Sequence, residues 1–247
     1  MYKQIEEMSL NGWPAIQTFV YDGWLLRFSD GYTKRSNSVQ PIYASTFDVQ
    51  EKITYCEQIY GKMGLDTIFK MTPFAEPQGL DKLLAARGYV IEDHTSVQVV
   101  DLANVGEPEA GDVRVESALS EEWLGHLSEM MGLSAEKQAA TRGILAPSYL
   151  TRGFFTLYYE GRPAAIGIGV IEREYIGLYD IFTDKSSRRR GFGEQLLLHI
   201  LKWGRRNGAD KGYLLVVKNN TPAVRLYAKL GYQEVYTYWY RYRMKEM

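Results

Sequence analysis

The feature that most constrains the fold is an internal repeat in the sequence. When the first half of the chain is shifted by 143 positions, the segment 83–89 falls on 226–232, and both segments end in Gly-Tyr. The same shift places Asp48 on Gly191, so the helices predicted at 48–63 and 191–207 coincide without gaps. Each copy is long enough to fold as a domain. The sequence therefore predicts that one α/β fold occurs twice in tandem.

Hydrophobic periodicity predicts the order of elements in the two copies. The first copy should contain a helix at 48–63, a strand at 68–71, a helix at 79–87 and a strand at 90–100. The second should contain strands at 112–118, 154–159, 164–171, 175–183, 213–217 and 235–244, with helices beginning near Ser120, Ala135, Gly191 and Thr221. An acidic segment with glycine and proline, 102–112, separates the copies. We therefore expect domains at 1–105 and 106–247.

The junction between the strand at 175–183 and the helix at 191–207 carries the clearest functional signal. Three consecutive arginines, at positions 188–190, precede Gly191 and Gly193. The start of a helix has unpaired backbone N–H groups and a partial positive charge, so it binds phosphate groups well. Glycine has no Cβ, which lets a pyrophosphate approach the backbone closely. These residues therefore predict a phosphate-binding turn.

Two known phosphate-binding patterns can be compared with this turn. A Rossmann dinucleotide site requires Gly-x-Gly-x-x-Gly, but Leu196 stands where the third glycine should be. The pattern Arg188-x-x-Gly191-x-Gly193 instead resembles the pyrophosphate loop of the GNAT family of N-acetyltransferases. A second segment, Asn220-x-x-Ala223-x-x-Leu226-Tyr227, resembles another cofactor-binding element of that family. The resemblance is closest over 112–247, slightly more than half of the chain.

The resemblance implies an α/β fold with a central mixed sheet flanked by helices, here in two tandem copies. It also implies that acetyl-CoA, the acyl donor, is held in a slot where the strands 175–183 and 213–217 splay apart. Backbone groups at the end of the first strand would pair with the pantetheine arm and polarise the thioester carbonyl. The residues implied to bind the cofactor are Ile181, Phe182, Thr183, Arg188, Arg189, Arg190, Gly191, Phe192, Gly193, Asn220, Ala223 and Tyr227.

Two side chains are candidates for proton transfer. Within the resemblance, Tyr227 is the general acid for the departing thiolate, because a phenol with a pKa of about 10 and a thiol with a pKa of about 8.5 are closely matched. The alternative is that Tyr227 is a core aromatic residue of a short helix. Asp180 lies on the strand that meets the thioester and could accept the proton of an amine. A structural ion pair would also explain Asp180, and the family has no universal base that would decide between these roles.

The acceptor side is predicted from polar residues in the segment 23–40, where Asp30-Gly31 indicates a two-residue hairpin turn. Arg27, Arg35 and Asn37 could project into a cleft between the domains and bind the acceptor. The alternative is a solvated hairpin face with cross-strand pairs. If the arginines line the site, an acceptor that carries a carboxylate, such as an amino acid or a peptide, would suit it.

The first copy lacks the cofactor signature. Under the shift of 143 positions, Asp48 and Gln50 take the places of Gly191 and Gly193. A carboxylate at a phosphate-facing helix start repels the ligand. We therefore expect that the first copy does not bind acyl-CoA and that it shapes or covers the acceptor site.

The bulk properties exclude several classes of protein. The formal net charge is −1, whereas nucleic-acid-binding domains are usually strongly basic. The sequence has no long apolar run and no apolar leader, so we expect a cytoplasmic protein without a membrane partner. A single cysteine, Cys56, excludes an internal disulfide framework and lies on the apolar side of its helix. The histidines at 94, 126 and 199 form no metal-binding pattern, so no metal is expected.

The leading prediction is therefore an enzyme, an N-acetyltransferase that transfers an acetyl group from acetyl-CoA to a primary amine. The acceptor would be a small molecule, an amino acid or a peptide, attacking directly in a ternary complex. The alternative is a non-catalytic acyl-CoA-binding regulatory or sensor module, against which the presence of Tyr227 and Asn220 argues. Tyrosines alternate along the last strand, which could pair with a second chain in a homodimer if it is an edge strand.

Overall fold

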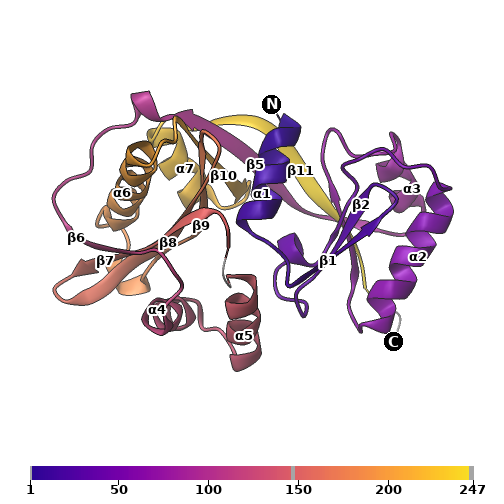
Figure 1. Ribbon diagram of the computed structural model, residues 1–247, viewed down its shortest axis with the longest axis horizontal. Coiled ribbons are helices and arrows are strands. Elements are labelled where there is room, and N and C mark those ends of the chain that lie inside the picture. Colours follow the sequence, from indigo (N-terminus) through magenta and orange to yellow (C-terminus); the bar gives the residue numbers. More distant parts are fainter. Residues whose placement is uncertain (1, 146–147, 245–247) are drawn as a thin grey trace.

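The computed structural model describes residues 2–145 and 148–244. In these residues the strands form one mixed sheet of 11 strands in the order β1-β2-β3-β4-β11-β5-β10-β9-β8-β7-β6 (Figure 1). The first copy contributes β1 (Gln17–Tyr21), β2 (Trp24–Phe28), β3 (Val39–Gln40), β4 (Thr67–Met71) and β5 (Val90–Asp101). The second contributes β6 (Asp112–Glu116), β7 (Thr151–Tyr159), β8 (Arg162–Glu172), β9 (Tyr175–Thr183), β10 (Lys211–Val217) and β11 (Gln233–Arg243).

The two copies exchange their last strands. β5 of the first copy pairs with β10 of the second, in antiparallel register from Lys211↔Asp101 to Val217↔Thr95. β11 of the second copy lies between β4 and β5 of the first and pairs with both. Each copy therefore completes the sheet of the other, and Figure 1 shows the long β5 and β11 crossing the middle of the molecule. The idea that the tyrosine-rich strand is an exposed edge is wrong, because β11 has a neighbour on each side.

The helices confirm the predicted repeat. α2 (Val49–Lys62) corresponds to α6 (Phe192–Arg206), and α3 (Leu80–Ala86) corresponds to α7 (Thr221–Lys229). The second copy also contains α4 (Glu121–Met131) and α5 (Ala135–Ile144), the latter with the predicted bounds. The helix predicted to begin near Thr221 is capped by Asn220, whose side chain accepts a hydrogen bond from the backbone N–H of Ala223.

The helices divide the core into three clusters. α1 (Tyr2–Gly12), α4 and α5 cover one face of the second half of the sheet, and α6 and α7 cover the opposite face (Figure 1). α2 and α3 pack on the sheet of the first copy. Tyr236, Tyr238 and Tyr240 are buried together in the cluster beneath α1, as their alternation predicts.

A buried ion pair fixes α1 over the centre of the sheet. Lys70 of β4 donates to the carboxylate of Glu6, and both side chains are fully buried. The hydroxyl of Tyr236 on β11 donates to the other carboxylate oxygen of Glu6 at 2.7 Å. A buried charge is tolerated only when it is paired and hydrogen-bonded. The network therefore ties the first helix to one strand from each copy.

The N-terminal segment contains elements that the sequence pattern did not reveal. α1 and β1 were not predicted, and the two-residue hairpin turn lies at Asp22-Gly23, where φ is 41° and 83°. The turn at Asp30-Gly31 instead leads into a short 3-10 helix, Lys34–Ser36, before the chain pairs with β2 through β3. The residues between β2 and β3 thus form the 3-10 helix Lys34–Ser36, which contributes to the candidate site described below.

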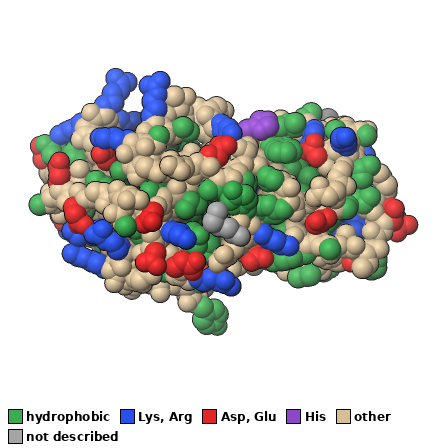
Figure 2. All heavy atoms as spheres, turned by 90° about the horizontal axis from the view of Figure 1, so that it is seen from above, with side chains coloured by type: hydrophobic (Ala, Val, Ile, Leu, Met, Phe, Trp, Pro, Cys, Tyr) green, Lys and Arg blue, Asp and Glu red, His purple; other side chains and the backbone are tan. Residues whose placement is uncertain are grey.

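The surface carries charges of both signs. Figure 2 shows basic and acidic side chains interspersed over the face that it displays, without a broad region of one sign. Among the described helices none is long and apolar enough to cross a membrane.

Candidate active site

The site is built where β9 and β10 separate. These parallel strands pair only from Tyr175↔Lys211 to Gly177↔Tyr213. Beyond that point β9 continues to Thr183 on its β8 side, and β10 continues to Val217 on its β5 side. A cavity of about 210 Å³ lies at the separation and is lined from both strands by Asp180, Leu215 and Val217. The splay that the resemblance implied is therefore present, and a cavity lies at it.

A β-bulge in β9 turns Asp180 toward this cavity. Tyr179 pairs with Ile168 and Phe182 pairs with Ile166, so β9 has one more residue than β8 between the two pairs. Asp180 has a φ of 46°, a conformation that residues other than glycine adopt rarely. Because a bulge interrupts the alternation of side chains, Asp180 faces the same side as its neighbour Tyr179. The bulge could not be predicted from residue type.

The surroundings of Asp180 raise the pKa of its carboxyl group. Its Oδ2 atom is buried and makes no hydrogen bond with any described residue. Burial raises the pKa of Asp180 from 3.8 to about 6, and the positive charge of Arg35 opposes part of this rise. A carboxyl group that titrates close to neutral pH is suited to general base catalysis.

Arg35 reaches the same cavity from the first copy. Its guanidinium lies 5.7 Å from the ring centre of Trp13 and 5.9 Å from that of Tyr179. Its Nε atom is buried and has no hydrogen-bond partner among the described residues. Trp13, Tyr238 and Tyr240 also line the cavity. Sequence reasoning missed Trp13, and it noted the alternating tyrosines without assigning them to the site.

The other two residues expected to bind the acceptor lie under the cavity wall. The guanidinium of Arg27 is buried and donates to the carbonyl oxygens of Leu10, Trp13 and Arg35. Asn37 accepts hydrogen bonds from the backbone N–H groups of Ser29 at 2.7 Å and Gly31 at 3.0 Å. Both side chains therefore hold the segment that carries Arg35, and direct acceptor binding by them stays a prediction. The solvated hairpin face considered as the alternative is wrong for both, because both are buried.

At the predicted phosphate-binding turn, the open space expected beside a glycine is found at Gly191. Gly191 has a φ of 84° and begins α6 without a side-chain cap, and a Cβ built on it would meet no atom within 4 Å. The first N–H groups of α6 are thus exposed beside open space, as anion binding requires. Gly193 has a different role, because a Cβ there would lie 2.9 Å from Oγ1 of Thr183. Because glycine lacks this Cβ, α6 can pack closely on β9.

The arginines of the turn differ in their surroundings. Arg188 donates from Nε to the carbonyl oxygen of Thr183 at 3.3 Å, and Arg189 has a φ of 61°. The guanidinium of Arg190 lies 4.2 Å from the ring centre of Tyr159. Phe192 supplies a second ring to Arg190, at 5.1 Å. Contacts of Arg188 and Arg190 on one side of Gly191, and of Phe192 on the other, therefore stabilise the turn.

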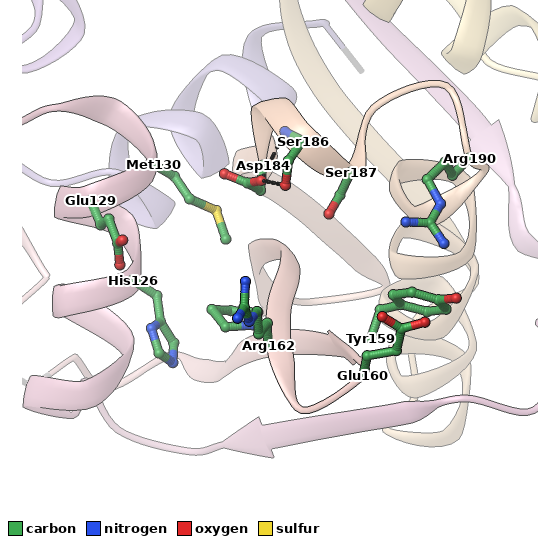
Figure 3. A pocket seen from close by; sticks show the side chains of 11 residues that line it. His126, Glu129, Met130, Tyr159, Glu160, Arg162, Asp184, Ser186, Ser187 and Arg190 are labelled. Carbon is green, nitrogen blue, oxygen red and sulfur yellow. Dashed lines mark hydrogen bonds between the residues drawn. The ribbon is translucent and has the colours of Figure 1, made fainter.

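A second cavity, of about 720 Å³, lies beside this turn rather than at the strand separation. In Figure 3, His126, Glu129 and Met130 from α4 face Ser186 and Ser187 of the turn across it. Asp184 accepts a hydrogen bond from the backbone N–H of Ser186 at 2.9 Å and shapes that wall. None of its described lining residues comes from β9 or β10, so it is distinct from the smaller cavity at the separation of these strands.

Tyr227, the predicted general acid, is half-buried on α7. Its ring lies 5.9 Å from that of Tyr232. Its hydroxyl forms no hydrogen bond within the described parts of the chain, and burial raises its pKa to about 12. The phenol therefore keeps its proton at neutral pH. Asn220 caps α7 through a hydrogen bond of 3.4 Å to Ala223, and this fixes the helix that carries Tyr227.

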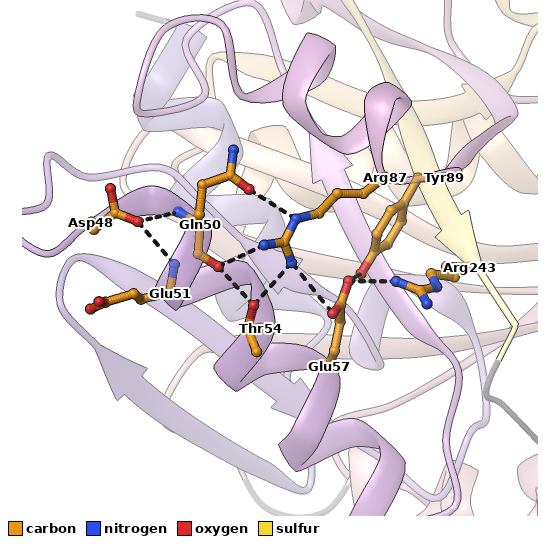
Figure 4. A network of polar contacts seen from close by, with 8 residues as sticks. All are labelled: Asp48, Gln50, Glu51, Thr54, Glu57, Arg87, Tyr89 and Arg243. Carbon is orange, nitrogen blue, oxygen red and sulfur yellow. Dashed lines mark hydrogen bonds and ion pairs between the residues drawn. The ribbon is translucent and has the colours of Figure 1, made fainter.

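The corresponding place in the first copy is filled by protein side chains. Asp48 accepts hydrogen bonds from the N–H groups of Gln50 and Glu51 at 2.8 and 3.1 Å, so the start of α2 is already capped (Figure 4). Arg87 crosses this helix end and donates to the Gln50 side chain at 2.9 Å and to its carbonyl oxygen at 3.1 Å. It also donates to Oγ1 of Thr54. These contacts support the prediction that the first copy binds no acyl-CoA.

The remaining reactive side chains have ordinary roles. Cys56 is buried, and burial raises its pKa to about 12, so its thiol is unreactive. His126 contacts the hydroxyl of Tyr158 at 3.3 Å, and His199 contacts the carbonyl oxygen of Glu109 at 3.1 Å. The described residues contain no cluster of three or more His, Cys, Asp or Glu side chains that could hold a metal ion.

Comparisons with known sequences agree with this geometry. The family described as "Probable histone acetyltransferase Rv0428c C-terminal" matches residues 2–242. The "Uncharacterized N-acetyltransferase YobR" of Bacillus subtilis (strain 168) is 28% identical over 245 residues, which cover 97% of each chain. The ribosomal protein bS18-alanine N-acetyltransferase of Escherichia coli (strain K12) is 31% identical over 80 residues, which cover 32% of this chain and 54% of that protein.

Solved structures show the same fold at low sequence identity. A GCN5-related N-acetyltransferase from Kribbella flavida superposes with a TM-score of 0.73 at 16% identity, covering 98% of this chain and 93% of that one. A tandem GNAT protein from the clavulanic acid biosynthesis pathway superposes with a TM-score of 0.65 at 14% identity, covering 80% and 70% of the two chains.

Proposed function

The chain belongs to the GNAT N-acetyltransferases and is an acyltransferase, and on this premise we propose that it transfers an acetyl group from acetyl-CoA to a primary amine. The acceptor is a small molecule, an amino acid or a peptide that attacks directly in a ternary complex. One observation carries the proposal: β9 and β10 separate beside an uncapped helix that begins at Gly191. This combination offers a slot for an extended thiol ester and an anion site for its phosphates.

The proposed donor site uses the residues that the resemblance implied. The N–H groups at the start of α6 and the arginines at 188–190 bind the pyrophosphate of acetyl-CoA. The free edge of β9, from Ile181 to Thr183, pairs with the pantetheine arm, because β10 has moved away from it. Asn220 and Ala223 at the start of α7 complete this side of the slot. The first copy, which we place at 1–105, supplies the opposite wall through Trp13 and Arg35.

The proposed reaction uses Asp180 and Tyr227 in sequence. An alkylammonium with a pKa of about 10.4 must first lose a proton, at a cost of roughly 4–5 kcal/mol near neutral pH. Asp180 takes this proton and later releases it to solvent. The free amine attacks the thioester carbon, so a C–N bond forms, and the C–S bond breaks when the tetrahedral adduct collapses. Tyr227 gives its proton to the departing thiolate and regains one from the amide nitrogen. The products are the acetamide, the CoA thiol and one released proton.

Calorimetric titration of acetyl-CoA tests the donor site. We expect micromolar binding near one per chain, lost in Gly191→Glu, because the new carboxylate projects into the phosphate space. Gly79→Glu is a matched control, since Gly79 also begins a helix, with a φ of 87° and no atom within 4 Å of a Cβ. This control should bind as the wild type does. Two sites per chain would contradict the assignment of the first copy, and no binding to the wild type would refute the proposed function.

A further inference from the structure

The cavity between β9 and β10 contains one cation and one carboxyl group that each have a buried atom without a hydrogen bond to a described residue. Arg35 and Asp180 both line it. The buried Nε of Arg35 and the buried Oδ2 of Asp180 each lack a hydrogen bond to any described residue. The other two charged groups of the cavity are already paired, since Lys34 bonds Asp93 at 2.8 Å as well as Glu92. Unmet hydrogen-bonding capacity in this cavity is therefore confined to one basic and one acidic side chain.

Such an arrangement is costly unless a ligand completes it. Buried charged groups normally have hydrogen-bonded partners of opposite sign, and the penalty for leaving them unpaired is large. A guanidinium favours carboxylates because its N–H groups match the two carboxylate oxygens. A carboxylate favours an ammonium group. A single ligand that carries both an ammonium and a carboxylate would satisfy the two side chains together.

We propose that the acceptor is a free amino acid, whose ammonium group is bound by Asp180 and whose carboxylate is bound by Arg35. The inference rests on the proposed function and narrows its acceptor class. Asp180 lies on the strand that borders the donor slot, so an amine bound to it is next to the thioester. Arg35 comes from the first copy and lies against Trp13 and Tyr179, which leaves its charge directed to the cavity.

The size and lining of the cavity favour a free amino acid over a peptide. Both charged groups must fit within about 210 Å³. In a peptide the carboxyl group next to the terminal amine is in an amide bond, and the terminal carboxylate lies at the far end of the chain. The rest of the lining combines the rings of Trp13, Tyr238 and Tyr240 and the side chains of Leu215 and Val217 with the polar residues Thr33, Lys34, Asp93 and Thr95. The aromatic and aliphatic side chains suit the carbon skeleton of the ligand.

The test compares each of the twenty standard amino acids with its own carboxamide, which has the same shape and lacks the negative charge. Release of CoA thiol from acetyl-CoA gives kcat/KM for each acceptor. Thermal unfolding in the presence of CoA and the same compounds reports binding without turnover. We expect at least one amino acid to exceed its carboxamide about tenfold or more in kcat/KM, because a charge-assisted hydrogen bond is lost in the carboxamide.

Three variants separate the proposed contact from a structural role. Arg35→Gln should bring the ratio of acid to carboxamide close to one, whereas Arg35→Lys should retain part of it because the positive charge remains. Arg205→Gln is the matched control, since Arg205 lies outside the cavity and its charge is paired with Glu107, and it should leave the ratio as in the wild type. Far-ultraviolet circular dichroism confirms that each variant is folded.

The outcomes distinguish this inference from the proposed function. Equal turnover of acids and carboxamides by the wild type would overturn the inference and leave the acetyltransferase assignment in place. A ratio that survives in Arg35→Gln would also overturn it. Stabilisation by amino acids in the absence of any turnover would support the amino-acid site and refute the proposed reaction. If no compound is turned over and none stabilises the protein, both this inference and the proposed function are overturned.

Discussion

Replacement of Asp180 by Asn should change the stability of the protein in a pH-dependent way. The pKa of Asp180 rises from 3.8 to about 6 because its carboxyl group is buried, despite the nearby charge of Arg35. At about 1.36 kcal/mol per pH unit, this rise corresponds to about 3 kcal/mol of destabilisation when the carboxyl group is ionised. Between about pH 4 and pH 6 the folded protein keeps a proton that the unfolded chain has released. Wild-type stability therefore falls as the pH rises through this window.

The asparagine variant lacks this titration, so the difference between the two proteins isolates it. We expect the free energy of unfolding of Asp180→Asn, relative to that of the wild type, to be about 3 kcal/mol larger at about pH 8 than at about pH 3.5, so that the variant is relatively more stable at the higher pH. Any constant cost of the new amide cancels in this comparison. Urea-induced unfolding, followed by tryptophan fluorescence at the two pH values, measures the difference.

The same variant should lose activity as it gains stability. In the wild type the logarithm of kcat/KM should rise with pH up to about pH 6, where Asp180 ionises. In Asp180→Asn this limb should disappear and the plateau should be lower. A stability difference that is the same at both pH values would refute the burial argument. If kcat/KM of the variant still rises with pH up to about pH 6, Asp180 is not the base.

Two other predictions concern single side chains. Tyr227→Phe should lower kcat about tenfold or more and leave acetyl-CoA affinity nearly intact, because only the acidic proton is lost. Stopped-flow or steady-state assays measure the turnover, and unchanged turnover would show that Tyr227 is not the acid. Glu6→Gln should destabilise the fold by about 3–5 kcal/mol in urea unfolding at neutral pH, because it leaves the buried charge of Lys70 unpaired. Glu121→Gln removes the exposed pair with Arg142 and should cost less than about 1 kcal/mol; similar losses in the two variants would contradict the assigned difference in burial.

Local elements of the fold could be predicted from the sequence because their signals are local. The bounds of α5 and β9 follow from capping residues and apolar runs, and the positive φ of Gly191 follows from its place before a helix. The pairing of β5 with β10 could not be predicted in this way. Alternation shows which face of a strand is buried, but it does not identify the neighbouring strand.

The sequence names candidate residues more completely for the donor side than for the acceptor side. Gly191, Asn220 and Tyr227 lie in contiguous motifs, so their spacing carries the signal. Trp13 and Arg35 meet Asp180 only after the two copies have exchanged strands and the bulge has turned the carboxyl group. Contacts between residues so far apart in the chain leave no periodic pattern in a single sequence.

The exchanged strands also govern the order in which the protein can fold. During synthesis, β4 and β5 leave the ribosome long before β11, which must enter between them. Until then β5 lacks β11 as a neighbour, and the cavity wall that includes Tyr238 and Tyr240 does not exist. Because pairings between distant parts of the chain form slowly, the first half waits for the last strand. The proposed acceptor site can therefore form only in a chain whose synthesis has passed β11.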